Sequence, residues 1–117
     1  MRKGLRSRKG MAEVRLPVGE REWLELAMGC GFRVKAMAAV LGMSERTLRR
    51  RFRREVKERL WEWLRRKRME LARQLLREGT LVKELPGRLG YGSVSAFCRA
   101  YRRWWGRLPG EERKQAG

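Results

Sequence analysis

VKAMAAVLGMSERTLRRRFRR, residues 34–54, predicts two short helices joined by a tight turn. Residues 34–41 place apolar side chains three and four positions apart, which is typical of a helix with one buried face. Gly42 can adopt the positive φ that ends a helix, and Ser44 is a favourable N-cap for the next one. The second helix is rich in arginine. This order of elements predicts a helix-turn-helix whose second helix faces a polyanion.

The charge of the chain indicates the nature of its partner. The 117 residues carry 31 Lys and Arg against 13 acidic residues, a net charge of +18. Such an excess repels itself, so an anionic partner is expected. Arginine outnumbers lysine, which favours bidentate contacts to phosphate or guanine. A GC-rich genome would also replace lysine codons by arginine codons, so both explanations stay open.

The missing residue types exclude several classes of function. The chain has no His, Asp or Asn, and its two cysteines are Cys30 and Cys98. Zinc sites and catalytic triads need residues of these types, so we expect no enzyme, no metal and no cofactor. Two cysteines fit a reducing cytoplasm better than a disulfide framework. Because there is neither a long apolar run nor a hydrophobic signal segment, we expect a cytoplasmic, nucleoid-associated protein without membrane contact.

Three other segments complete the expected fold. Residues 20–28 form a short amphipathic helix, and residues 58–78 consist of strong helix formers without Gly or Pro. The latter predicts a connecting helix of about 20 residues and ~30 Å. Its Trp61 and Trp63 are expected as buried anchors rather than as base-stacking groups. Residues 1–16 are basic and aperiodic, and are either a disordered tail or an arm along the DNA backbone.

The first helix-turn-helix has a second copy in the chain. VKAMAAVLGM at 34–43 aligns with VKELPGRLGY at 82–91, and the arginine-rich helices that follow also correspond, with one extra turn residue in the second copy. Internal repetition is a more specific signal than either copy alone. Two such units joined by a ~30 Å helix predict two recognition helices in successive major grooves, about 34 Å apart on one face of DNA.

These patterns predict an all-α fold in which two helix-turn-helix subdomains are joined by a long connecting helix. The expected boundaries are a basic N-terminal tail at 1–16, a first subdomain at 17–57, the connecting helix at 58–79, a second subdomain at 80–113 and a C-terminal tail at 114–117.

From about residue 20 to residue 113 the chain resembles the DNA-binding domain of the AraC/XylS family of bacterial transcription regulators. The resemblance rests on LGMSERTLRRRFRR at 41–54, RKRMELARQLL at 66–76 and LGYGSVSAFCRAYRRWWGRLP at 89–109. It implies two helix-turn-helix units joined by a helix, and binding to double-stranded DNA near promoters.

The resemblance also assigns roles to individual residues. Those expected to contact base edges are Arg46, Arg49, Arg50, Val94, Ser95, Cys98 and Arg99. Those expected to bind phosphates are Ser44, Arg53, Arg54, Arg102 and Arg103. The alternative for the arginines is a solvated basic face that contacts only phosphates. Cys98 is expected as an exposed helix residue rather than as a redox sensor.

Three positions depart from the family pattern. Pro86 replaces the usual Ala and is followed by Gly87, Lys57 replaces a Gly, and Leu108 replaces a Ser or Thr. Proline in a helix interior costs ~3 kcal/mol. The helix that begins near Val82 must therefore start late, kink or be short. For the second unit this predicts either a different docking on DNA or phosphate contacts without sequence reading.

Our leading hypothesis is a sequence-specific regulator, an activator that recruits RNA polymerase and binds DNA as a monomer. A non-specific architectural or mobile-element DNA-binding protein is the alternative, favoured by the high charge and by Pro86. A third hypothesis, the DNA-binding part of a recombinase, places any catalysis outside this chain because Asp and His are missing.

Overall fold

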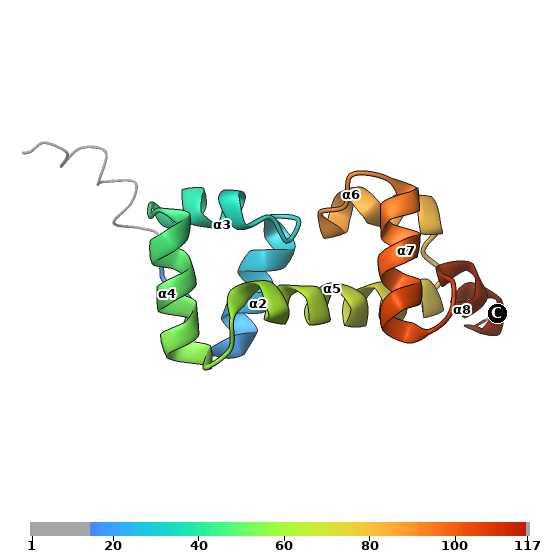
Figure 1. The fold of residues 1–117 in the computed structure, drawn as a ribbon, viewed down its shortest axis with the longest axis horizontal. Coiled ribbons are helices and arrows are strands. Elements are labelled where there is room, and N and C mark those ends of the chain that lie inside the picture. The colour runs from blue at the N-terminus through green and yellow to red at the C-terminus, as the bar shows by residue number, and fades with distance from the viewer. Residues whose placement is uncertain (1–14, 117) are drawn as a thin grey trace, which may run out of the picture. The chain divides into compact units, whose positions relative to one another are not determined.

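The structure, a computed structural model, describes residues 15–116, with side chains up to Glu112 (Figure 1). Every regular element in this range is helical, which confirms the all-α prediction. The helices are α2 (Gly19–Gly29), α3 (Val34–Leu41), α4 (Glu45–Val56), α5 (Leu60–Arg77), the 3-10 helix η1 (Val82–Glu84), α6 (Leu85–Leu89), α7 (Val94–Trp105) and α8 (Pro109–Ala116).

The chain divides into two compact units, Met1–Leu60 and Trp61–Gly117. We call them unit 1 and unit 2. Unit 1 contains α2, α3 and α4, and unit 2 contains α5 from its second residue onward together with all later helices. The predicted basic tail falls almost entirely on residues 1–14, which lie outside the described residues.

Unit 1 is built around the contact of α2 with both helices of the helix-turn-helix. The ring of Trp23 on α2 meets Phe52 on α4 edge-on, with ring centroids 5.1 Å apart and planes at 81°. Both side chains are buried, as is Met37 on α3. An edge-to-face aromatic pair adds about 0.5–1.5 kcal/mol beyond its area burial. The apolar stripe expected from the sequence is therefore the core of this unit.

The turn between α3 and α4 has the predicted geometry. Gly42 takes a left-handed φ of 68°, and the amide of Met43 donates to the Ala38 carbonyl at 3.0 Å. The Ser44 hydroxyl then caps α4 by accepting from the amide of Thr47 at 3.1 Å. These contacts satisfy backbone groups that a helix end leaves without partners.

The connecting helix α5 runs over Leu60–Arg77, 18 residues against the predicted 58–78. At 1.5 Å per residue its length is about 27 Å. Trp63 is fully buried, so the anchor prediction is confirmed for this residue. The same prediction is wrong for Trp61, which is 52% exposed. Trp61 lies outside the stripe of fully buried side chains that begins with Leu60, Trp63 and Leu64.

Pro86 shapes the start of the second helix-turn-helix, as predicted. The chain forms the single 3-10 turn η1 and then the five-residue α6, with Pro86 in its first turn. A proline there removes no intrahelical hydrogen bond. Its carbonyl accepts from the Tyr91 amide at 2.8 Å, which repeats the contact of Ala38 with Met43 48 positions earlier. The second helix-turn-helix therefore has a shorter first helix but keeps the turn that follows it.

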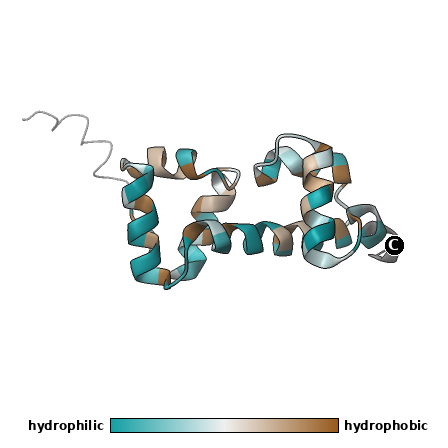
Figure 2. Ribbon diagram, in the orientation of Figure 1, coloured by the Kyte–Doolittle hydropathy of each residue, from teal (hydrophilic) through white to brown (hydrophobic). Residues whose placement is uncertain are grey.

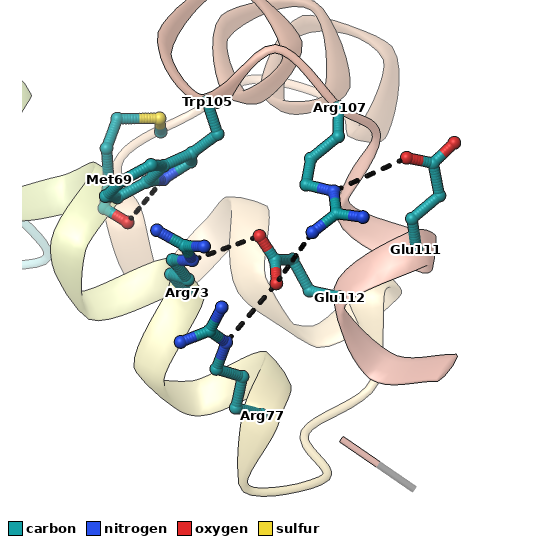
Figure 3. A network of polar contacts seen from close by, with 7 residues as sticks. All are labelled: Met69, Arg73, Arg77, Trp105, Arg107, Glu111 and Glu112. Atoms are coloured by element: carbon teal, nitrogen blue, oxygen red, sulfur yellow. Dashed lines mark hydrogen bonds and ion pairs between the residues drawn. The ribbon is translucent and has the colours of Figure 1, made fainter. Parts of the chain in front are cut away.

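Unit 2 ends in α8, a helix for which the sequence analysis gave no prediction and which runs into the expected tail at 114–117. Its Glu112 is fully buried, and its carboxylate pairs with guanidinium groups from α5 and from the loop before α8 (Figure 3). The distances are 3.1 Å to Arg73, 3.3 Å to Arg77 and 3.9 Å to Arg107. Such a cluster ties three segments of unit 2 together.

The environment of Glu112 favours its charged form. Burial raises the pKa of the carboxyl, but the nearby Tyr101 hydroxyl and the guanidinium groups of Arg73 and Arg77 together lower it further, so the net pKa lies below its usual range. Next to this cluster, Trp105 donates from Nε1 to the Met69 carbonyl at 3.1 Å (Figure 3). Arg73 lies 4.2 Å from the Trp105 ring centroid, a cation–π contact.

Candidate nucleic-acid interface

The helix α4 separates its side chains into a buried pair and an exposed basic surface. Leu48 and Phe52 are fully buried. All six arginines of the helix are exposed: Arg46, Arg49, Arg50, Arg51, Arg53 and Arg54. Figure 2 shows α4 as mostly hydrophilic along its length. Two buried residues four positions apart fix which side of the helix faces the core, so the arginines are left outside.

The guanidinium groups of α4 differ in their partners. Arg49 lies 3.6 Å from the carboxylate of Glu45, one turn earlier. Among the described residues no ion pair involves Arg46 or Arg50. Exposed pairs of this kind contribute about 0.3–0.5 kcal/mol, so Arg49 can exchange Glu45 for a stronger acceptor. The guanidinium groups of Arg46, Arg49 and Arg50 are therefore available to a partner in the first two turns of α4.

Ser44 has a structural task in addition to its predicted phosphate contact. Its hydroxyl accepts from the Thr47 amide at 3.1 Å and lies 3.0 Å from the Thr47 hydroxyl, to which it donates. The side chain is exposed. A cap residue of this type contributes about 0.5–2 kcal/mol to its helix.

The helix α7 repeats the plan of α4 with different side chains. Ser93 caps it by accepting from the Ala96 amide at 3.1 Å, and Phe97 and Tyr101 are fully buried. Val94 is 45% exposed, and Ser95 and Arg99 are exposed as well. Cys98 is half-buried, whereas the sequence predicted an exposed helix residue. Figure 2 shows hydrophobic and hydrophilic residues mixed on α7.

The four late arginines that were expected to bind phosphates, Arg53, Arg54, Arg102 and Arg103, are exposed in the last turns of α4 and α7. Cations in the last turn also interact favourably with the helix dipole. Each unit therefore places candidate base contacts early and candidate phosphate contacts late on the same helix.

Comparisons with known proteins agree with this geometry. A family model described as a helix-turn-helix domain matches residues 37–115, more than half of the chain. AraC-like transcription regulators of Streptomyces antibioticus and Streptomyces lividans are 38% and 39% identical over 82 residues. This chain belongs to the AraC family. It matches over 69% of its own length but over 27% of the length of each of these two relatives.

Solved structures of AraC-type regulators have the same fold. The DNA-binding domain of AdpA, a global transcriptional factor crystallised with a target DNA, is 32% identical with a TM-score of 0.63, covering 81% of this chain and 89% of that domain. CdpR of Pseudomonas aeruginosa is 33% identical with a TM-score of 0.53, covering 88% of this chain and 28% of CdpR. An AraC-type regulator of Chromobacterium violaceum, at 23% identity, TM-score 0.59 and 95% coverage of both chains, shares the fold.

Within this AraC-family chain, Glu45 is a residue of the candidate interface that the sequence analysis missed. It stands in the first turn of α4 and pairs with Arg49. The signal was present in the sequence, because a Glu four residues before an Arg on a helix favours an i,i+4 pair.

No helix in residues 15–116 combines the length and the apolar character that crossing a bilayer requires.

Proposed function

We propose that this chain is a sequence-specific transcription regulator that inserts α4 and α7 into successive major grooves of double-stranded DNA. The observation that carries the proposal is the pair of serine-capped, 12-residue helices with basic surfaces, each the second helix of a helix-turn-helix. The likeness to the AdpA DNA-binding domain, whose structure contains a target DNA, supports the same partner for this chain.

In this proposal the first unit supplies most of the sequence recognition. Arg46, Arg49 and Arg50 contact base edges, with guanine O6 and N7 as the acceptors that suit a guanidinium fork. Their exposure in the first two turns of α4 supports this role, because recognition helices of this class contact bases through N-terminal residues. In the second unit Val94, Ser95, Cys98 and Arg99 occupy the corresponding early positions.

The remaining basic residues orient the protein on the duplex. Arg53, Arg54, Arg102 and Arg103, together with Ser44, contact phosphates and carry no sequence information themselves. The length of the connecting helix α5, about 27 Å, is of the same order as the ~34 Å repeat of the major groove. One monomer then occupies two grooves. Activation by contact with RNA polymerase, and a location on the nucleoid, belong to this proposal.

A binding-site selection from random duplexes, repeated over a salt series, tests the proposal. A regulator with two recognition helices yields a site with two preferred blocks about one helical turn apart, and keeps its preference for that site as salt rises. The chain would be purified with its N-terminal residues 1–14 present, because they hold five basic residues and one acidic residue, Glu13, and so add to any non-specific binding.

A non-specific architectural protein is the second candidate, since the net charge of +18 alone would bind any duplex. Such a protein gives no enriched motif in the selection, and its affinity falls steeply and equally for all sequences as salt increases. That result would replace the proposed regulator by the architectural protein.

A further inference from the structure

The two recognition helices can be compared position by position, because the structure fixes their register. Both contain 12 residues, and both begin after a serine whose hydroxyl accepts from the amide three residues later, at 3.1 Å in each case. The caps are Ser44 and Ser93. Counted from the caps, the corresponding early positions are Glu45 and Val94, Arg46 and Ser95, Arg49 and Cys98, and Arg50 and Arg99.

The chemistry at these positions differs sharply between the helices. The four positions of α4 hold one carboxylate and three guanidinium groups, whereas those of α7 hold a branched alkyl group, a hydroxyl, a thiol and a single guanidinium. The first turn of α7 contains no acidic residue. Only Arg99 can therefore donate a guanidinium fork from this part of α7.

Val94 is the distinctive member of the set. It occupies the first helical position of α7 and is 45% exposed, while Phe97 and Tyr101 on the same helix are fully buried. Packing within unit 2 thus leaves much of its side chain in water. One turn later Cys98, half-buried and uncharged, continues this apolar edge of the helix.

In the major groove the C5-methyl of thymine is an apolar group at the base edge, and alkyl side chains contact it. We infer that Val94 recognises a thymine through this methyl group, with Cys98 beside it. This inference rests on the proposed insertion of α7 into the major groove. Unit 2 thereby selects thymine by apolar contact, whereas unit 1 selects guanine by hydrogen bonds.

The test removes the methyl group from the DNA. The block contacted by α7 is first identified as the one in which a selection with Arg46→Ala changes no base preference, since Arg46→Ala relaxes a position of the other block. Each thymine of that block is then replaced by deoxyuridine, and the affinity of the unaltered protein is measured. At one position the affinity should fall about fourfold, the equivalent of about 0.8 kcal/mol for one buried methyl group.

Two variants assign the effect to Val94. With Val94→Ala the ratio of affinities for thymine and uracil at that position should fall to about one. Val40→Ala is the matched control, because Val40 is 49% exposed on α3, outside both recognition helices, and it should keep the fourfold ratio. Circular dichroism establishes that both variants are helical. The deoxyuridine measurement itself uses the unaltered protein, so its result does not depend on the folding of a variant.

The outcomes separate this inference from the proposed function. If the selection gives two blocks but no thymine of the α7 block responds to loss of its methyl group, the thymine contact is wrong and the regulator stands. A fourfold ratio that persists in Val94→Ala also overturns the assignment to Val94. If the selection gives no motif at all, the proposed function itself is wrong.

Discussion

The two helix-turn-helix units present the same backbone plan with different chemistry. In both, a left-handed glycine ends the first helix, a serine caps the second, and two aromatic or aliphatic side chains four residues apart bury one side of it. The first helix, however, shrinks from eight residues in α3 to five in α6. The comparison shows that a capped second helix and its buried pair are retained when the helix before it is shortened by three residues.

The support behind each recognition helix also differs. Unit 1 uses the preceding helix α2, whose Trp23 packs on Phe52 of α4. Unit 2 uses the following helix α8, whose Glu112 is bound by arginines, together with the aromatic series Phe97, Tyr101 and Trp105 along α7. Unit 2 therefore combines aromatic contacts with a buried charge, whereas the Trp23–Phe52 contact of unit 1 is apolar, so the two units should respond differently to mutation and to pH.

The largest expected effect is on the stability of unit 2. Glu112→Gln removes the charge that three guanidinium groups share, and we expect the free energy of opening of α7 to fall by about 2–3 kcal/mol. This is less than the 3–5 kcal/mol of a fully buried pair, because the arginines keep access to water. Amide hydrogen exchange of α7 measures it, with α4 as the internal reference.

Glu111→Gln is the matched control for that experiment. Glu111 is the neighbouring acid on α8, pairs with Arg107 at 3.7 Å and is 53% exposed, so its loss should cost less than about 0.5 kcal/mol. Equal effects of the two substitutions would show that the buried cluster does not hold unit 2.

The second effect concerns DNA. Arg46→Ala should weaken binding to the selected site by about 1–3 kcal/mol and relax the preference at one position. Arg53→Ala, on the same helix but in its last turn, should weaken all sequences alike and lower the salt slope by about one. Equilibrium titrations at several salt concentrations separate the two. A uniform loss with Arg46→Ala would make that residue a phosphate contact.

A smaller effect follows from the lowered pKa of Glu112. Because the folded state holds this carboxyl ionised below its usual range, the stability it contributes is fully present above the unfolded-state pKa of about 4.3. It is lost as the pH falls through the lower folded-state pKa. Protection of α7 should therefore decrease in acid more in the unaltered protein than in Glu112→Gln, and parallel curves would contradict this.

The smallest effect is at the ends of the two recognition helices. Lys57 ends α4 with a left-handed φ of 71°. The corresponding residue at the end of α7 is Gly106, with a φ of 79°. Lys57→Gly should stabilise unit 1 by about 0.5–1 kcal/mol because the strain of a side chain at positive φ disappears. Gly106→Lys should destabilise unit 2 by a similar amount, since an added Cβ there meets no other atom and only the strain changes.

Thermal unfolding of these variants, with Lys57→Ala as the control, completes the comparison. Alanine removes the charge but keeps the strained conformation, so Lys57→Ala should bring none of the stabilisation. If alanine stabilises as much as glycine, the charge of Lys57 and not its backbone is responsible.

Much of the fold was predictable because its signals are local. Periodic apolar residues, Gly42, Ser44 and the uninterrupted run of helix formers gave α3, α4 and α5 nearly to their ends. Pro86 correctly predicted a late and short helix, since the loss of its backbone donor acts within one turn. The helix α8 was missed, because Glu112, which binds it to the rest of unit 2, is a charged residue that composition alone assigns to the surface.

The sequence by itself determined that this chain forms two basic helix-turn-helix units, the first with its recognition helix capped by Ser44, because caps, turns and helical periods are read within a few residues. Tertiary structure alone decided that Glu112 is buried among arginines, that Trp63 is buried while Trp61 is exposed, and that Val94 remains in water. Those outcomes depend on which side chains distant in sequence meet, and no local pattern contains that information.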